Sequence, residues 1–171
     1  MSKNETFFVR LINVMIFLNT LQADTSVGIL KSIEDNSKQI VLTKNSSHGC
    51  EPFGIITLEK ILRNGASTQE CKKAVIDFYT SHPHDKQFAR EHLYIQQSYH
   101  YEMIKEGCVL YANGKETYSE MLLRQGVALI DPAFNNSEWN RRLKRAQKGS
   151  EQQKRGIHHT LIQKWCIKEE K

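Results

Sequence analysis

The chain has 171 residues, with 24 lysines and arginines against 19 aspartates and glutamates, so its formal net charge is +5. A composition that is 39% hydrophobic, with only three prolines, excludes a collagen-like chain and argues against a disordered one. The length fits one domain that buries roughly two thirds of its unfolded surface.

The first 23 residues have the pattern of a secretory signal peptide. Lys3 and Arg10 lie in the first ten residues, and an apolar run that only Asn and Thr interrupt follows over 11–21. The small residue Ala23 then precedes Asp24. The run is shorter than the ~20 residues that span a bilayer. We therefore expect a mature chain of residues 24–171 without a transmembrane segment, secreted or periplasmic; a buried N-terminal strand or helix is the alternative.

Four cysteines lie in the expected mature chain, at Cys50, Cys71, Cys108 and Cys166. An even number of cysteines in an oxidising compartment predicts two disulfides, although three pairings are allowed and buried free thiols are the alternative. No cysteine or histidine spacing is typical of a zinc site or of haem attachment.

The pattern of the mature chain predicts a single α+β domain. Runs rich in β-branched and aromatic residues predict five strands, at 27–33, 39–43, 53–58, 92–99 and 108–112. Capping boxes at Ser67–Glu70 and Thr117–Glu120, and Asn135 with Glu138, precede apolar stripes and predict three helices, near 68–81, 117–125 and 136–155. Gly126 is expected to end the second helix, and Leu143 and Ala146 to lie in the apolar stripe of the third. Residues 44–52 have a turn-like composition.

Five strands with a helix between the third and fourth have the order of an OB barrel. The sequences YANGK at 111–115 and SEMLLRQGVA at 119–128, with the basic helix that ends near residue 157, resemble the staphylococcal-nuclease (thermonuclease) family. The resemblance is close over about 50 residues and weaker over 27–157. It implies a five-stranded Greek-key OB-fold barrel with three helices, in which Ile55, Leu122 and Val127 are buried.

Nucleases of that family cleave DNA and RNA with one Ca²⁺ held mainly by two aspartates. Here Asn36 falls at one of these positions and Glu59 at the other. The resemblance therefore implies a metal set of Glu34, Asp35 and Glu59, in altered form, since a hard cation requires carboxylate oxygens. No cofactor is expected unless this altered set still binds Ca²⁺.

The other catalytic positions of the family are also substituted. Leu62 stands where a glutamate activates the attacking water, and Gly54 replaces the first of two arginines that stabilise the transition state. Lys105 replaces the second arginine, which keeps the charge but loses the bidentate fork. Glu59 and Lys105 are thus the remaining catalytic candidates, and a nuclease would need Arg63, Glu34 or Asp35 to compensate.

Residues 136–155 hold seven lysines and arginines against two glutamates. This helix is a candidate polyanion surface, because each phosphate that a cation contacts releases counterions. The candidate nucleic-acid-binding residues are Arg141, Lys144, Arg145 and Lys148. A solvated helix face is the alternative.

These observations favour an exported, catalytically impaired nuclease-like module, expected to be a monomer. Its expected partner is DNA or RNA, bound weakly and without sequence preference, or an envelope or secretion-system protein. Two alternatives are a working Ca²⁺-dependent phosphodiesterase with a rebuilt site and a purely structural partner in an envelope assembly.

Overall fold

The computed structural model describes residues 26–64 and 67–167. The predicted signal peptide and its cleavage position lie outside the described residues. No helix in the described part is long and apolar enough to cross a membrane.

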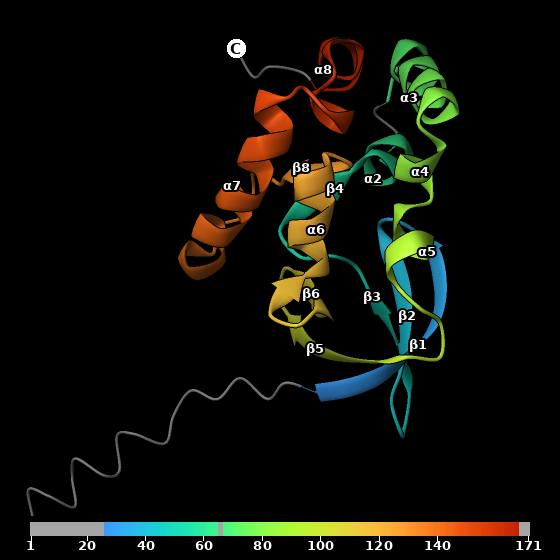
Figure 1. Cartoon of the computed structure of the whole chain (residues 1–171), viewed down its shortest axis with the longest axis vertical. Coiled ribbons are helices and arrows are strands. Elements are labelled where there is room, and N and C mark those ends of the chain that lie inside the picture. Colours follow the sequence, from blue (N-terminus) through green and yellow to red (C-terminus); the bar gives the residue numbers. More distant parts are fainter. Residues whose placement is uncertain (1–25, 65–66, 168–171) are drawn as a thin grey trace, which may run out of the picture.

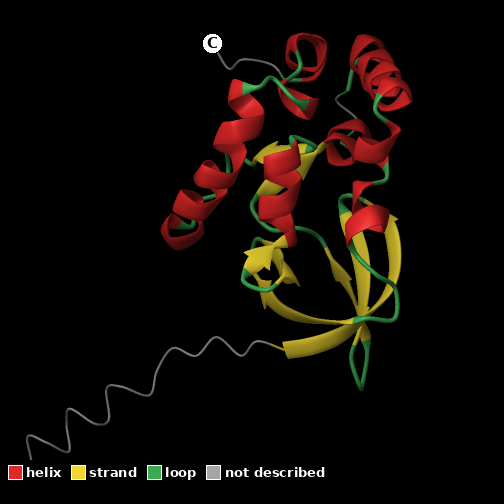
Figure 2. Cartoon of the chain, viewed as in Figure 1, coloured by secondary structure: helices red, strands yellow, loops and turns green. Residues whose placement is uncertain are grey.

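An antiparallel sheet of six strands, in the order β3-β2-β1-β5-β6-β7, forms one end of the molecule (Figure 1). Its strands are β1 (Ser26–Asp35), β2 (Lys38–Leu42), β3 (Ser47–Cys50), β5 (Ser98–Ile104), β6 (Gly107–Asn113) and β7 (Glu116–Thr117). A second sheet pairs β4 (Ile55–Thr57) with β8 (Ala128–Ile130). Figure 2 shows this small sheet among the helices. The described residues thus contain more strands than the five expected.

The large sheet curls, so that β3 near one edge meets β6 near the other. A disulfide joins Cys50 to Cys108 across this contact, with 5.1 Å between their Cα atoms. Next to it, the Cys108 backbone N–H donates to the carbonyl of Glu51 at 2.7 Å, and that of Phe53 donates to the carbonyl of Cys108 at 3.3 Å. The sheet is therefore cross-linked covalently where its two ends meet.

The helices gather at the other end of the molecule (Figure 1). They are α2 (Leu58–Arg63), α3 (Gln69–Ser81), α4 (Pro83–Lys86), α5 (Phe88–His92), α6 (Tyr118–Gln125), α7 (Ser137–Gln152) and α8 (Thr160–Cys166), with a 3₁₀ turn at Gly156–His158. A second disulfide, Cys71–Cys166, joins α3 to α8. The prediction of two disulfides is confirmed, and the structure supplies the pairing that the sequence left open.

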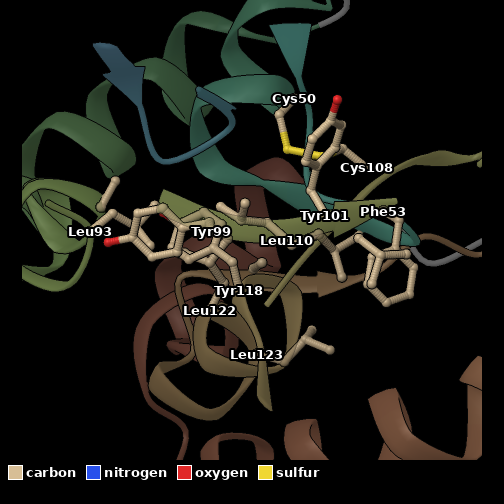
Figure 3. Packing of buried hydrophobic residues seen from close by; sticks show 14 of the residues in the cluster. Cys50, Phe53, Leu93, Tyr99, Tyr101, Cys108, Leu110, Tyr118, Leu122 and Leu123 are labelled. Carbon is tan, nitrogen blue, oxygen red and sulfur yellow. A yellow bond between two sulfur atoms is a disulfide. The ribbon is translucent and has the colours of Figure 1, made fainter. Parts of the chain in front are cut away.

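The main core lies between the curled sheet and α6. Ile55 is 2% exposed, while Leu122 and Val127 are fully buried, as expected. Figure 3 shows Tyr118 and Leu122 of α6 near Tyr99 of β5, and the Cys50–Cys108 disulfide next to Tyr101 of the same strand. A smaller core between α3 and α8 surrounds the second disulfide.

The sequence signals at α6 are confirmed in detail. Thr117 and Glu120 form the predicted capping box, and Gly126 ends the helix with a φ of +86°. At α3 the N-cap is Thr68 rather than the expected Ser67. The Thr68 hydroxyl accepts from the backbone N–H of Cys71.

Two expected segments are wrong. The predicted strand at 92–99 is mostly helix end and loop, and β5 begins at Ser98. Tyr99 and Tyr101 are buried on either side of the exposed His100 and lie within β5, which continues to Ile104. The turn predicted at 44–52 contains β3, which pairs with β2, so β3 and not the strand expected at 53–58 is the third strand of the large sheet. Of that expected strand, residues 55–57 form β4, which pairs with β8 in the small sheet.

Candidate functional site

A cleft of about 850 Å³ lies where the β1–β2 turn meets α2, α3, α4 and α5. Its charged and amide side chains come from the turn, from α2 and from the α4–α5 segment: Glu34, Asp35, Asn36, Glu59, Lys86 and Arg90. The structure therefore brings the three predicted carboxylates, Glu34, Asp35 and Glu59, to one cleft.

Asn36 joins the β1–β2 turn to three helices. Its fully buried side chain donates from Nδ2 to Oε1 of Glu59 at 3.0 Å and to the carbonyl of Asp85 at 2.9 Å. Its Oδ1 accepts from the backbone N–H of Ala89 at 2.9 Å. At the position where the family has a metal-binding aspartate, this chain has an amide that donates to the second acidic position.

Glu59 follows β4 at the start of α2, where Thr57 caps the helix. Its Oε1 also accepts from the Tyr79 hydroxyl at 2.7 Å, while its buried Oε2 has no partner within hydrogen-bonding distance. Burial raises the pKa of Glu59 although Tyr79 stabilises the charged form, and burial beside Glu59 raises the pKa of Tyr79 as well. This carboxyl group is therefore held mainly by neutral donors.

Asp35 has a different environment, because cations and hydroxyls surround it. Arg63 contacts it at 2.5 Å, and the backbone and hydroxyl of Ser37 each donate to it at 2.7 Å. Partial burial raises the pKa of Asp35, but the hydrogen bonds from Ser37 and Arg63 outweigh that effect, so its pKa lies below the usual range. Glu34 pairs with Lys38 at 3.2 Å on the exposed rim.

These contacts test whether the expected Ca²⁺ set fits. Asn36 and Tyr79 occupy one oxygen of Glu59, and Arg63 and Ser37 occupy Asp35. Among the described residues, no three histidine, cysteine, aspartate or glutamate side chains are arranged to hold a metal ion. The donor set present does not fit a hard cation, which requires about six oxygen ligands.

The two arginine positions of the family also differ here. Gly54 has a φ of +66°, and a Cβ there would lie 2.9 Å from Leu143 and 3.0 Å from Phe134, so the backbone and the packing both exclude an arginine. Lys105 lies exposed in the turn between β5 and β6 and does not line the cleft. Leu62, at the position of the general base, does line it.

Four cations form one exposed face of α7. Arg141, Lys144, Arg145 and Lys148, here called the basic stripe, follow helical spacing and are all exposed. Within the described residues, none of them forms a hydrogen bond or an ion pair. The opposite face buries Leu143 and Ala146, as predicted, so the helix is anchored with its cations outward.

Arg142 lies between these faces and has a structural role. It donates to both carboxylate oxygens of Glu120, at 3.0 and 2.6 Å, and its guanidinium lies 4.7 Å from the centre of the Trp139 ring. Partial burial raises the pKa of Glu120, but hydrogen bonds from Arg142 and Thr117 more than compensate, so that pKa is lowered. This pair fastens α7 to the N-terminus of α6.

The sequence did not identify Tyr79 or the hydrogen bonds of Asn36. Tyr79 continues the apolar stripe of α3 and so has the pattern of a core residue. No protein-family model matches the chain, and no curated protein sequence matches it.

Proposed function

We propose that the mature chain is an exported OB-fold module of the nuclease-like type that binds nucleic acid without cleaving it. The observation that carries this proposal is the basic stripe. Its four cations have no intramolecular partner among the described residues, and they project from a helix whose other face is buried. Unpaired cations at this spacing suit a phosphate backbone, which requires charge and no base-specific contacts.

The OB fold is part of the proposal and is supported by strand order. An OB barrel pairs its first strand with the second and fourth, and its fifth strand closes against the third. Here β1 lies between β2 and β5, while β6 meets β3 through the Cys50–Cys108 disulfide. The short strands β4, β7 and β8 are additions to that plan.

The absence of catalysis is supported by the cleft. Glu59 accepts from an amide and a phenol, Asp35 pairs with Arg63, and Leu62 stands where a general base would lie. An active phosphodiesterase needs a group that activates water and donors aimed at the developing charge on phosphorus. The Lys105 side chain lies outside the cleft lining and so supports no such role there.

Export is supported by the two disulfides, which persist in oxidising compartments. N-terminal sequencing of protein from its native source tests this part, with a start at or near Asp24 expected. Recovery of chains that retain Met1 in a reducing compartment would contradict it.

Binding is tested with a variant in which all four residues of the basic stripe are glutamine. Fluorescence anisotropy with a labelled single-stranded DNA is measured across a salt series. If all four cations contact phosphates, the slope of log affinity against log salt becomes shallower by about 3 units, since each lost contact removes about 0.7 on single strands.

A matched control removes the same charge elsewhere. Lys31, Lys44, Lys72 and Lys73 are also exposed and lie outside α7, so their change to glutamine lowers the net charge equally. We expect this control to keep most of the affinity. An equal loss of DNA affinity in both variants would show that only the net charge matters. Unchanged DNA binding in the stripe variant would favour the structural-partner alternative.

The catalytic alternative is tested by incubating the mature protein with single-stranded DNA in Ca²⁺ and then in EDTA. We expect no chelator-sensitive cleavage. Cleavage that EDTA abolishes, and that Glu59→Gln also removes, would establish the rebuilt phosphodiesterase instead.

A further inference from the structure

A second cleft, of about 350 Å³, lies beyond the C-terminal end of α7. The end of α3, the short α4, the end of α6 and the segment from Lys154 to His159 form its walls. Five basic side chains line it: His82, His84, Lys154, Arg155 and His159. All five are exposed, and the cleft is separate from the acidic one described above.

The turn that carries Lys154 and Arg155 is held rigidly. The backbone N–H of Arg155 donates to the carbonyl of Ser150 at 2.9 Å, and that of Ile157 donates to the carbonyl of Gly126 at 2.6 Å. Lys154 itself has a φ of +50°, which lysine rarely adopts. The two cations are therefore presented from a fixed backbone, and in the described residues neither has an ion-pair partner.

Two acidic groups at this cleft already have partners. Asp85 is the single acidic residue in the lining; it is buried and accepts from the Gln125 amide at 2.7 Å. Glu91 contacts His84 at 2.7 Å from outside the cleft. With Lys154 and Arg155 against Asp85, the formal charge of the lining is positive even when its histidines are neutral.

Two of the histidines are oriented by their Nδ1 atoms. His82 contacts the carbonyl of Phe78 at 3.1 Å and stacks on that ring with the centres 4.5 Å apart. The Nδ1 of His159 accepts from the backbone of Leu161 at 3.4 Å. In both residues Nε2 remains as the polar ring atom available to a ligand, and both rings line the cleft together with Lys154 and Arg155.

We propose that this cleft binds a phosphate group, with Lys154 and Arg155 supplying positive charge and the Nε2 atoms of His82 and His159 adding hydrogen bonds. Guanidinium and ammonium groups are the usual phosphate ligands. The site goes beyond the proposed nucleic-acid surface and does not depend on it. The phosphate comes either from a nucleic-acid backbone or from a free phosphate compound.

The test is an NMR titration of the ¹⁵N-labelled mature protein with two probes, dimethyl phosphate and inorganic phosphate. Dimethyl phosphate carries one negative charge and has the phosphodiester group of a nucleic-acid backbone. We expect saturable shifts at residues 154–159. Binding of both probes assigns the site to phosphodiesters, while binding of inorganic phosphate alone assigns it to free phosphate.

Paired variants make the result decisive. Lys154→Gln with Arg155→Gln is expected to weaken dimethyl phosphate binding at least tenfold, and His82→Gln with His159→Gln is expected to weaken it by a smaller factor. His100→Gln removes an exposed histidine from β5, outside the cleft, and should leave the affinity unchanged.

Shifts that do not saturate, or equal affinity in the Lys154/Arg155 variant, would overturn the proposal. The glutamine variant of the basic stripe separates the two proposals. Intact dimethyl phosphate binding with lost DNA binding supports both, whereas unchanged DNA binding in that variant removes only the nucleic-acid surface on α7.

Discussion

Changing Asn36 to aspartate introduces the acidic residue that the resemblance to the nuclease family aligns with this position. The new carboxylate would lie about 3 Å from Oε1 of Glu59, because the Asn36 amide now donates to that oxygen at 3.0 Å. Two charges at that distance repel by about 5 kcal/mol at an effective dielectric constant of 20. To fold at neutral pH, the variant must therefore keep one of these two carboxyl groups protonated.

The loss of folding stability can be estimated from the free energy of keeping that group protonated. Keeping an aspartate protonated at pH 7, when its unfolded pKa is about 3.9, costs about 4 kcal/mol, and the same state at pH 5 costs about 1.5. The loss of the donor to the Asp85 carbonyl adds about 1 kcal/mol at either pH. We expect Asn36→Asp to lower the free energy of unfolding by about 5 kcal/mol at pH 7, and by about 2.5 at pH 5.

Urea unfolding followed by far-UV circular dichroism at both pH values measures this difference. Asn113→Asp is the matched control, since it makes the same chemical change at an exposed position, the last residue of β6. A penalty at Asn36 below 1 kcal/mol at pH 7, or one that stays constant down to pH 5, would refute the account of this contact. Strong stabilisation of the variant by Ca²⁺ would show that only this residue separates the cleft from a metal site.

Three further predictions concern the scaffold, each measured by urea unfolding. Changing Cys50 and Cys108 to alanine should cost about 4 kcal/mol, because their disulfide closes a loop with a sequence separation of 58; equal stability of the parent and the variant after reduction of both, which also opens Cys71–Cys166 in each, is the internal check. Arg142→Ala should cost about 2 kcal/mol by leaving Glu120 without its cation. The pKa of Glu120 is lowered in the folded protein, so the stability that this ion pair contributes is fully present above pH 4.5 and is lost as the pH falls through the folded pKa. The variant lacks the pair and should therefore lose less stability in acid than the parent. Gly126→Ala should cost more than 1 kcal/mol, since its φ is +86° and the new Cβ would lie 2.7 Å from the carbonyl oxygen of Arg155; a neutral result would contradict this close approach.

Local signals in the sequence were sufficient for α6 and α7. The capping box at Thr117 and Glu120 and the stop at Gly126 depend on contacts within a few residues, so the pattern alone specifies them. The burial of Leu143 and Ala146 likewise follows from helical periodicity. These elements were predicted because their physical causes are local.

The cleft could be predicted only in part. The sequence placed Glu34, Asp35 and Glu59 at one site through family resemblance, and the structure brings them to one cleft. It could not show that Asn36 contacts residues 23, 49 and 53 positions away, because such contacts depend on how the turn packs against α2, α4 and α5. The disulfide pairing could not be predicted from the sequence either, because it also depends on how distant segments pack together.

The cations of α7 fall into two groups, one that stabilises the fold and one that does not. Arg142 has carboxylate and aromatic partners, so its charge stabilises the contact between α7 and α6. Among the described residues the basic stripe has no such partners, and its cations repel one another at three- and four-residue spacings, which costs about 0.2–0.5 kcal/mol per pair. Folding therefore accounts for Arg142 and gains nothing from the stripe. Under the proposed function, a phosphate backbone would supply the negative charge that neutralises this face.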